Sequence, residues 1–176
     1  MDKIKVSQDK LKIFLDGHNF IMAALAKKMG VTEVLVSVCF RHKLNRHGNP
    51  LSFSKKNIEL LNLALQQISD ELIDCKLKCS NEDESASKRF INDDPAIIES
   101  LRRIGEYIKL RGLTEKVLGW NKKKCEDNIC LNSSNPHVHI SREDLERIST
   151  TVLSIAATLA QWEVVADEGS SSSSSE

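Results

Sequence analysis

A C-x4-C-x6-H-x-H pattern in the second half of the sequence contains the ligand types of a zinc site. Thiolate and imidazole groups are the ligands that tetrahedral zinc prefers. The spacing is not that of a defined zinc module, and an ordinary polar loop is the favoured alternative. We therefore predict no metal and no cofactor, and zinc stays as the minor alternative. The four residues are Cys125, Cys130, His137 and His139.

The other features of the chain that could carry covalent chemistry are few. The five cysteines are an odd number without an export signal at the start of the sequence, which favours reduced thiols in the cytoplasm. The sequence has no phosphate-binding glycine loop, no G-x-S-x-G and no H-E-x-x-H. It also lacks an apolar run of the roughly 20 residues that span a bilayer. We expect no enzyme and no membrane protein.

Charge alternates along the chain, although the 25 basic and 25 acidic residues cancel. Residues 1–56 carry +7, residues 57–100 carry −6, residues 101–130 carry +4 and residues 131–176 carry −5. Such a chain could present two cationic faces to a polyanion while remaining neutral overall. A mosaic surface without a partner is the alternative.

Amphipathic helices account for most of the 176 residues. The longest predicted helix, Ser54–Ile73, has apolar residues at alternating steps of three and four, which indicates a face turned to the core. Short extended arms could form at Leu51–Phe53 and Val138–Ile140, but no strand hairpin is predicted. The other predicted helices are Ser7–Leu15, Ile21–Met29, Thr32–Phe40, Pro95–Leu110, Thr114–Lys124 and Ser141–Trp162.

Two polar segments divide the chain. Residues 79–92 lack an apolar period and predict a linker, after which Asp94-Pro95 supplies an N-cap and first-turn proline for a new helix. Residues 167–176 form a Ser-rich tract with nothing to bury, which predicts a disordered tail. The expected domains are therefore residues 1–78 and 93–166.

The two domains share an internal repeat. Gly30-Val31-Thr32-Glu33 matches Gly112-Leu113-Thr114-Glu115 at an offset of 82 residues, and the apolar stripe of Ser54–Ile73 matches that of Ser141–Trp162 at an offset of 87. A duplicated unit explains both matches. General similarity among amphipathic helices would explain only the second.

Residues 22–41 resemble the helix-turn-helix of repressor-type (cro/cI-like) DNA-binding regulators. Ala26 is small where two helices cross, and Gly30 lies at the turn, where glycine best tolerates a positive φ. Thr32 follows as the N-cap of the second helix. The motif's remaining apolar positions are Leu25, Met29, Val31, Val36 and Cys39.

By this resemblance the second helix enters the major groove of double-stranded DNA, and flanking basic residues hold phosphates. The resemblance places Thr32, Glu33, Ser37 and Arg41 at the bases. It makes Lys27, Lys28, Lys43 and Arg46 phosphate contacts.

The second repeat departs from this pattern, because Ile108 and Arg111 stand where the motif has Ala26 and Met29. It is nevertheless rich in lysine, which favours salt-sensitive contact with a nucleic-acid backbone. The alternative is a solvated helix C-terminus, where lysines complement the helix dipole. The expected phosphate contacts are Lys116, Lys122, Lys123 and Lys124.

The sequence thus predicts an all-α protein of two related helix-turn-helix-like units joined by a polar linker. The expected function is that of a cytoplasmic DNA-binding protein that regulates transcription. One chain at an asymmetric site and a homodimer at a palindrome both remain open. The alternative function is protein–protein interaction, with the apolar 32–40 helix as the docking face.

Overall fold

The computed structural model describes residues 2–75, 77, 90–132 and 134–166. Within them the protein is mostly helical, with eight helices and five short strands. The predicted all-α class is therefore only approximate. The predicted tail, and the predicted linker up to residue 89, lie outside the described residues.

The chain divides into two compact units. Unit 1 comprises the described residues of Met1–Asp70 and Ala157–Glu176, and unit 2 those of Glu71–Ala156. The division falls inside two 20-residue helices, α4 (Lys55–Asp74) and α9 (Arg142–Gln161). The sequence had instead suggested boundaries at residues 78 and 93.

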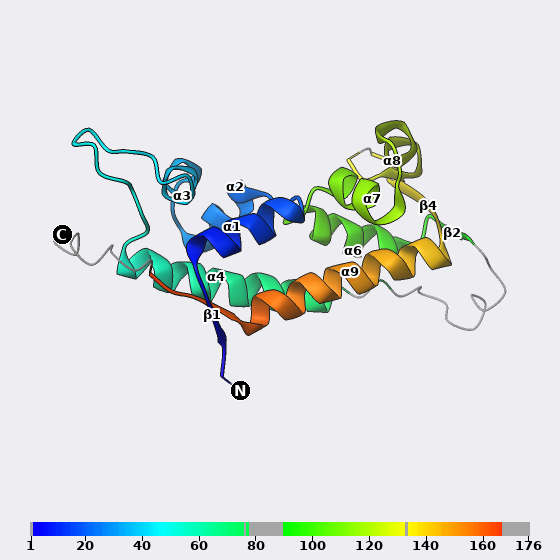
Figure 1. Ribbon diagram of the computed structural model, residues 1–176. Helices are drawn as coiled ribbons and strands as arrows, with labels where there is room; N and C mark the ends of the chain where they lie inside the picture. Colours follow the sequence, from blue (N-terminus) through cyan, green and yellow to red (C-terminus); the bar gives the residue numbers. More distant parts are fainter. Residues whose placement is uncertain (1, 76, 78–89, 133, 167–176) are drawn as a thin grey trace. The chain divides into compact units, whose positions relative to one another are not determined.

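Unit 1 begins with a strand followed by three short helices (Figure 1). Strand β1 (Ile4–Val6) pairs in parallel with β5 (Trp162–Val164). Ser7 caps the next helix by accepting a hydrogen bond from the backbone of Lys10. The helices are α1 (Gln8–Gly17), α2 (Met22–Met29) and α3 (Glu33–Phe40), and the first part of α4 follows.

Unit 2 also contains a strand, three short helices and a long helix in this order, but two further strands separate its third short helix from the long one. Asp94 caps α6 (Pro95–Gly105) as predicted, and its carboxylate accepts from the backbone of Ala96. Helices α7 (Leu110–Leu118) and α8 (Lys122–Asn128) follow, and α9 comes last. The antiparallel sheet has the order β2-β4-β3, with strands β2 (Phe90–Asn92), β4 (His137–Ser141) and β3 (Ile129–Cys130).

The long helices match the predicted amphipathic pattern. Ser54 and Ser141 each accept a hydrogen bond from the backbone N–H three residues later, as N-caps do. The apolar stripes are buried, which confirms the prediction that these faces belong to the core. In α4 the stripe is Ile58, Leu61, Leu65, Ile68 and Leu72, and in α9 it is Leu145, Ile148, Val152, Ile155 and Leu159.

Several local predictions were wrong. The helix predicted at Thr114–Lys124 is two helices, because Gly119 adopts a left-handed conformation and ends α7. The helix predicted at Pro95–Leu110 ends at Gly105. Phe90–Asn92, assigned to the linker, is a strand that pairs with β4. Val138–Ile140 is extended as expected within β4, but the hairpin that joins it to β3 was missed.

Candidate nucleic-acid interface

Helices α2 and α3 of unit 1 are joined by a tight turn centred on Gly30. This glycine has a φ of 75°, in the left-handed region where a Cβ causes strain. Its N–H donates to the carbonyl of Lys27 at 3.2 Å, and the N–H of Val31 donates to the carbonyl of Ala26 at 3.1 Å. These two bonds form a Schellman motif, which ends α2 and redirects the chain.

The second helix of the pair then starts at a defined residue. The Oγ1 of Thr32 accepts a hydrogen bond from the N–H of Leu35 at 3.2 Å, so that Thr32 is the N-cap of α3. Val31 is half-buried, and the other apolar positions of the helix-turn-helix pattern are buried. Those buried positions are Leu25, Ala26, Met29, Val36 and Cys39.

The apolar composition of α3 is explained largely by packing within unit 1. The ring of Phe40 meets that of Phe53 edge-on, with centroids 5.1 Å apart. Leu35 and Val38 are half-buried, and only Val34 is strongly exposed, at 70%. Burial also raises the pKa of the Cys39 thiol, because a thiolate is poorly solvated there.

The side chains predicted to face bases lie mainly on the exposed side of α3. Glu33 and Arg41 are exposed, whereas Ser37 is half-buried. Thr32 is exposed as well, although its hydroxyl oxygen already serves as the cap acceptor. Arg41 is the last residue of this surface and forms the C-cap.

A short hairpin between α3 and α4, Lys43–Leu51, extends this surface with positive charge. The N–H of Leu51 donates to the carbonyl of Lys43 at 2.8 Å, and Leu44 bridges Pro50. The Asn45 carboxamide oxygen accepts from two backbone N–H groups of the hairpin, at 2.8 and 3.0 Å. Figure 1 shows this segment, in light blue to cyan, projecting beyond α3. We call it the basic hairpin. Its exposed cationic side chains are Lys43 and Arg46, and His47 is exposed as well.

The start of the basic hairpin is held against α1. The Nε2 of His42 lies 2.9 Å from the Oδ1 of Asp9. His42 has a positive φ of 49°, so the chain turns sharply at this contact. Of the predicted phosphate contacts on α2, Lys27 is exposed and Lys28 is half-buried.

In unit 2 the predicted turn glycine was misplaced. Gly112 lies inside α7, and Thr114, which was aligned with the cap residue Thr32, is buried there. The residues that end α7 and start α8 are Gly119 and Asn121. The GLTE sequence therefore matches GVTE in residue types without occupying the same structural position.

The lysines of the second repeat lie in two places. Lys116 is exposed on α7, whereas Lys122, Lys123 and Lys124 form the first turn of α8. At that end of a helix cations do not complement the dipole, so the interpretation of a lysine-rich C-terminus was wrong for these three residues. The ammonium group of Lys124 lies 5.1 Å from the centroid of the Trp120 ring.

The four residues of the zinc pattern come from three elements of unit 2. Cys125 is buried in α8, and Cys130 of β3 pairs with His137 of β4. His139 is exposed and stacks on Phe90, with ring centroids 4.9 Å apart. Within the described residues, no group of three or more His, Cys, Asp or Glu side chains could hold a metal ion.

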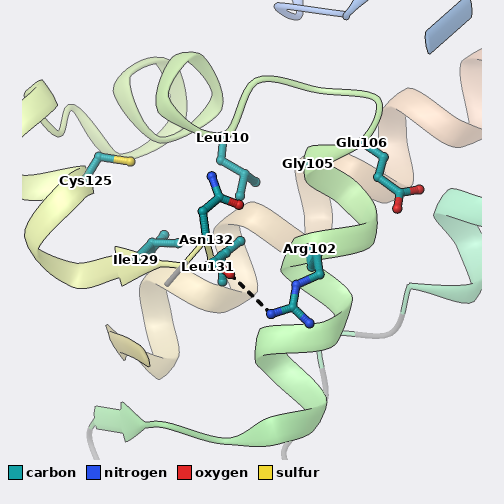
Figure 2. Close-up of a pocket in the computed structure, with 8 residues that line it drawn as sticks. All are labelled: Arg102, Gly105, Glu106, Leu110, Cys125, Ile129, Leu131 and Asn132. Atoms are coloured by element: carbon teal, nitrogen blue, oxygen red, sulfur yellow. Dashed lines mark hydrogen bonds between the residues drawn. The ribbon is translucent and has the colours of Figure 1, made fainter. Parts of the chain in front are cut away.

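A cavity of about 370 Å³ lies in unit 2 beside α8 (Figure 2). Cys125 and Arg102 lie on different sides of it, and the Arg102 guanidinium donates to the carbonyl of Leu131 at 3.2 Å. Arg102 also pairs with Glu99 at 3.2 Å. Its charge is therefore partly neutralised, and the cavity does not present an isolated cation to a ligand.

No family model, no curated protein and no solved structure matches this chain. Among the residues that the structure describes, none of the helices combines the length and the apolar character that crossing a membrane requires.

Proposed function

We propose that unit 1 binds double-stranded DNA, with α3 in the major groove and the basic hairpin on the phosphate backbone. The main observation behind this proposal is that the exposed side of α3 and the basic hairpin belong to the same unit. The Gly30 turn and the Thr32 cap fix α3 at its start, and the basic hairpin follows directly after its end. In repressor-type proteins the second helix of such a pair reads bases.

The chemistry of the exposed side chains supports this arrangement. The guanidinium of Arg41 can donate two hydrogen bonds to a guanine edge, and the Glu33 carboxylate can accept from a cytosine amine. Val34, 70% exposed, offers an apolar contact for a thymine methyl group. Lys27, Lys43 and Arg46 are exposed cations that would neutralise phosphates.

We further propose that the two units are copies of one helix-turn-helix-like design. Their caps and helices follow in the same order, and the caps Ser7 and Asp94 stand at the same offset of 87 residues as Ser54 and Ser141. The protein would then act without catalysis, as a cytoplasmic regulator of transcription. Sedimentation of the DNA complex would distinguish one bound chain from a homodimer.

The alternative function, docking of a protein on α3, has less support. It was based on the apolar sequence of this helix, but Val36, Cys39 and Phe40 are buried inside unit 1. Val34 remains as the one strongly exposed apolar side chain of α3. A single exposed valine is ordinary for a protein surface and does not form an apolar patch.

The test is a fluorescence-anisotropy titration of the full chain on random-sequence duplex DNA at 50 and 200 mM salt. The variant Arg41→Ala/Arg46→Ala removes two cations of the proposed surface. We expect weaker binding, with a salt slope smaller by about one, since Arg46 is a proposed phosphate contact and each such contact contributes about 0.9.

A matched control is Lys3→Ala/Lys5→Ala, which removes the same charge from one exposed position just before β1 and one on it, in the same unit. We expect this control to bind as the unmodified protein does. Equal losses in both variants would mean that net charge alone drives binding. If no salt-dependent binding is detected even at 50 mM salt, the proposal is rejected, and docking of a protein on α3 becomes the favoured function.

A further inference from the structure

Unit 2 contains a second helix–turn–helix, at a position where the sequence pattern did not place it. Gly119 has a φ of 69°, and its N–H donates to the carbonyl of Glu115 at 3.0 Å, which ends α7. Gly30 ends α2 in the same left-handed conformation. Both glycines are thus C-cap residues that redirect the chain between two short helices.

The two turns also have the same length. Two residues after Gly119, the carboxamide oxygen of Asn121 accepts from the N–H of Lys124 at 2.8 Å. Thr32 is likewise two residues after Gly30 and caps α3 through the N–H three residues later. The order glycine, inward-facing residue, N-cap is therefore the same in both units, with Trp120 buried in the intervening position.

The helices that follow bury corresponding positions. The residues four and eight positions after the cap are Val36 and Phe40 in unit 1. In unit 2 they are Cys125 and Ile129, and all four are buried. Ile129 is the first residue of β3, just past the end of α8, so the side of α8 that is turned inward is given by Cys125, the buried residue of this helix.

The opposite side of α8 is charged and exposed. The positions one, two and five after the cap hold Lys122, Lys123 and Glu126 in unit 2. The same positions of α3 hold Glu33, Val34 and Ser37, which belong to the base-facing surface proposed above. Lys124 differs from its neighbours, since its ammonium lies 5.1 Å from the centroid of the buried Trp120 ring.

A hairpin follows the second helix in both units. In unit 2, β3 and β4 pair through Ile129 with Val138 and Cys130 with His137. In unit 1 the basic hairpin closes through Leu44 and Pro50. The correspondence therefore covers the whole succession of turn, cap, second helix and hairpin.

We infer that α8 is a second DNA-reading helix, so that the full binding site consists of two parts with different sequences. Lysine donates to the O6 and N7 of guanine, and a carboxylate accepts from the cytosine amine. The part bound by Lys122, Lys123 and Glu126 is therefore rich in G·C pairs. This inference rests on the proposed function of unit 1.

The experiment is in vitro selection of duplex DNA with the full chain, followed by footprinting on the selected site. The variant Lys122→Ala/Lys123→Ala is compared with Lys109→Ala/Arg111→Ala, which removes the same charge from exposed positions near the start of α7. We expect the first variant to lose protection of the G·C-rich part only. Its affinity should fall about tenfold or more, because a specific base contact is worth about 1–3 kcal/mol.

The outcomes separate the two proposals. If the selected DNA site has a single part, and both unit 2 variants protect it equally, the inference about α8 is overturned. The proposal that unit 1 binds DNA then still stands. Loss of binding in both unit 2 variants by the same factor also overturns it, because charge and not base contact would then be responsible. Absence of any salt-dependent DNA binding overturns both proposals together. The variant Glu126→Gln tests the base contact separately, since a carboxamide pairs with adenine rather than cytosine and should shift the preferred base at one position of the G·C-rich part without weakening the other part.

Discussion

The side-chain amide of Asn62 on α4 forms two hydrogen bonds with the backbone of Val164 on β5. Its Nδ2 donates to the Val164 carbonyl at 3.0 Å, and its Oδ1 accepts from the Val164 N–H at 2.7 Å. Val164 is itself opposite Val6 in the parallel pair of β1 and β5. One side chain thus ties α4 to a strand 102 residues away within unit 1.

Replacing Asn62 should therefore destabilise unit 1. The Asn62→Ala variant leaves both backbone groups of a buried residue without this partner, which costs roughly 1–3 kcal/mol of unfolding free energy. Urea unfolding followed by circular dichroism measures the effect. The control is Gln67→Ala at an exposed position of the same helix, which should change stability by about 0.5 kcal/mol or less. Identical midpoints for both variants would contradict the prediction.

The two turn glycines should respond to alanine in the same way. Gly30→Ala and Gly119→Ala each force a Cβ into the left-handed region, at a cost of about 1–2 kcal/mol, although nothing crowds the new atom. Gly17→Ala is the matched control, because Gly17 lies at the end of α1 without a positive φ and also has open space. Thermal unfolding of the three variants provides the comparison. A Gly119→Ala variant as stable as Gly17→Ala would argue against the turn between α7 and α8.

Local sequence signals predicted the helices that have strong caps or a long periodic face. The turn at Gly30 and the cap at Thr32 were found because glycine and threonine are the preferred residues at these positions. The same reasoning failed at Gly112. The match of Gly112–Glu115 to Gly30–Glu33 placed the turn there, although Gly119 and Asn121 also have the residue types of a turn glycine and an N-cap. Gly112 shows that a glycine within a helix is indistinguishable from a turn glycine until the helix end is known.

Apart from the extended segment Val138–Ile140 of β4, the strands were not predicted from local patterns. They are two to five residues long, and their pairing depends on distant segments, as with Ile4 of β1 and Trp162 of β5. Strand formation follows such tertiary context more than intrinsic preference. For the candidate site, the residue types of the basic hairpin were recognised from its charge, but its closure by Leu44 and Pro50 was not. The base-facing and phosphate contacts remain predictions.

The buried rings of Phe40 and Phe53, which meet edge-on, should be a major source of stability for α3 and the basic hairpin. Phe40→Ala removes a buried ring and should cost roughly 3–5 kcal/mol. Val34→Ala on the same helix should be nearly neutral, because Val34 is 70% exposed. Urea unfolding of Phe40→Leu, Phe53→Leu and the double variant measures the coupling between the rings, which we expect to be about 0.5–1.5 kcal/mol. Strictly additive losses would mean that the rings do not stabilise each other.

The buried thiol of Cys39 should make the protein less stable at alkaline pH. Burial raises its pKa in the folded state, so the folded protein favours the protonated thiol. The resulting stabilisation is complete below the pKa of the unfolded thiol, about 8.5, and is lost as the pH rises through the higher folded value. Urea unfolding at pH 7 and pH 10 measures this loss.

Cys39→Ala should be less stable at pH 7 because of the cavity it leaves, yet lose less stability on going to pH 10. Cys75, whose pKa is also raised by burial, is present in both proteins and cancels in the comparison. Equal losses in the two proteins would show that Cys39 does not titrate in the transition.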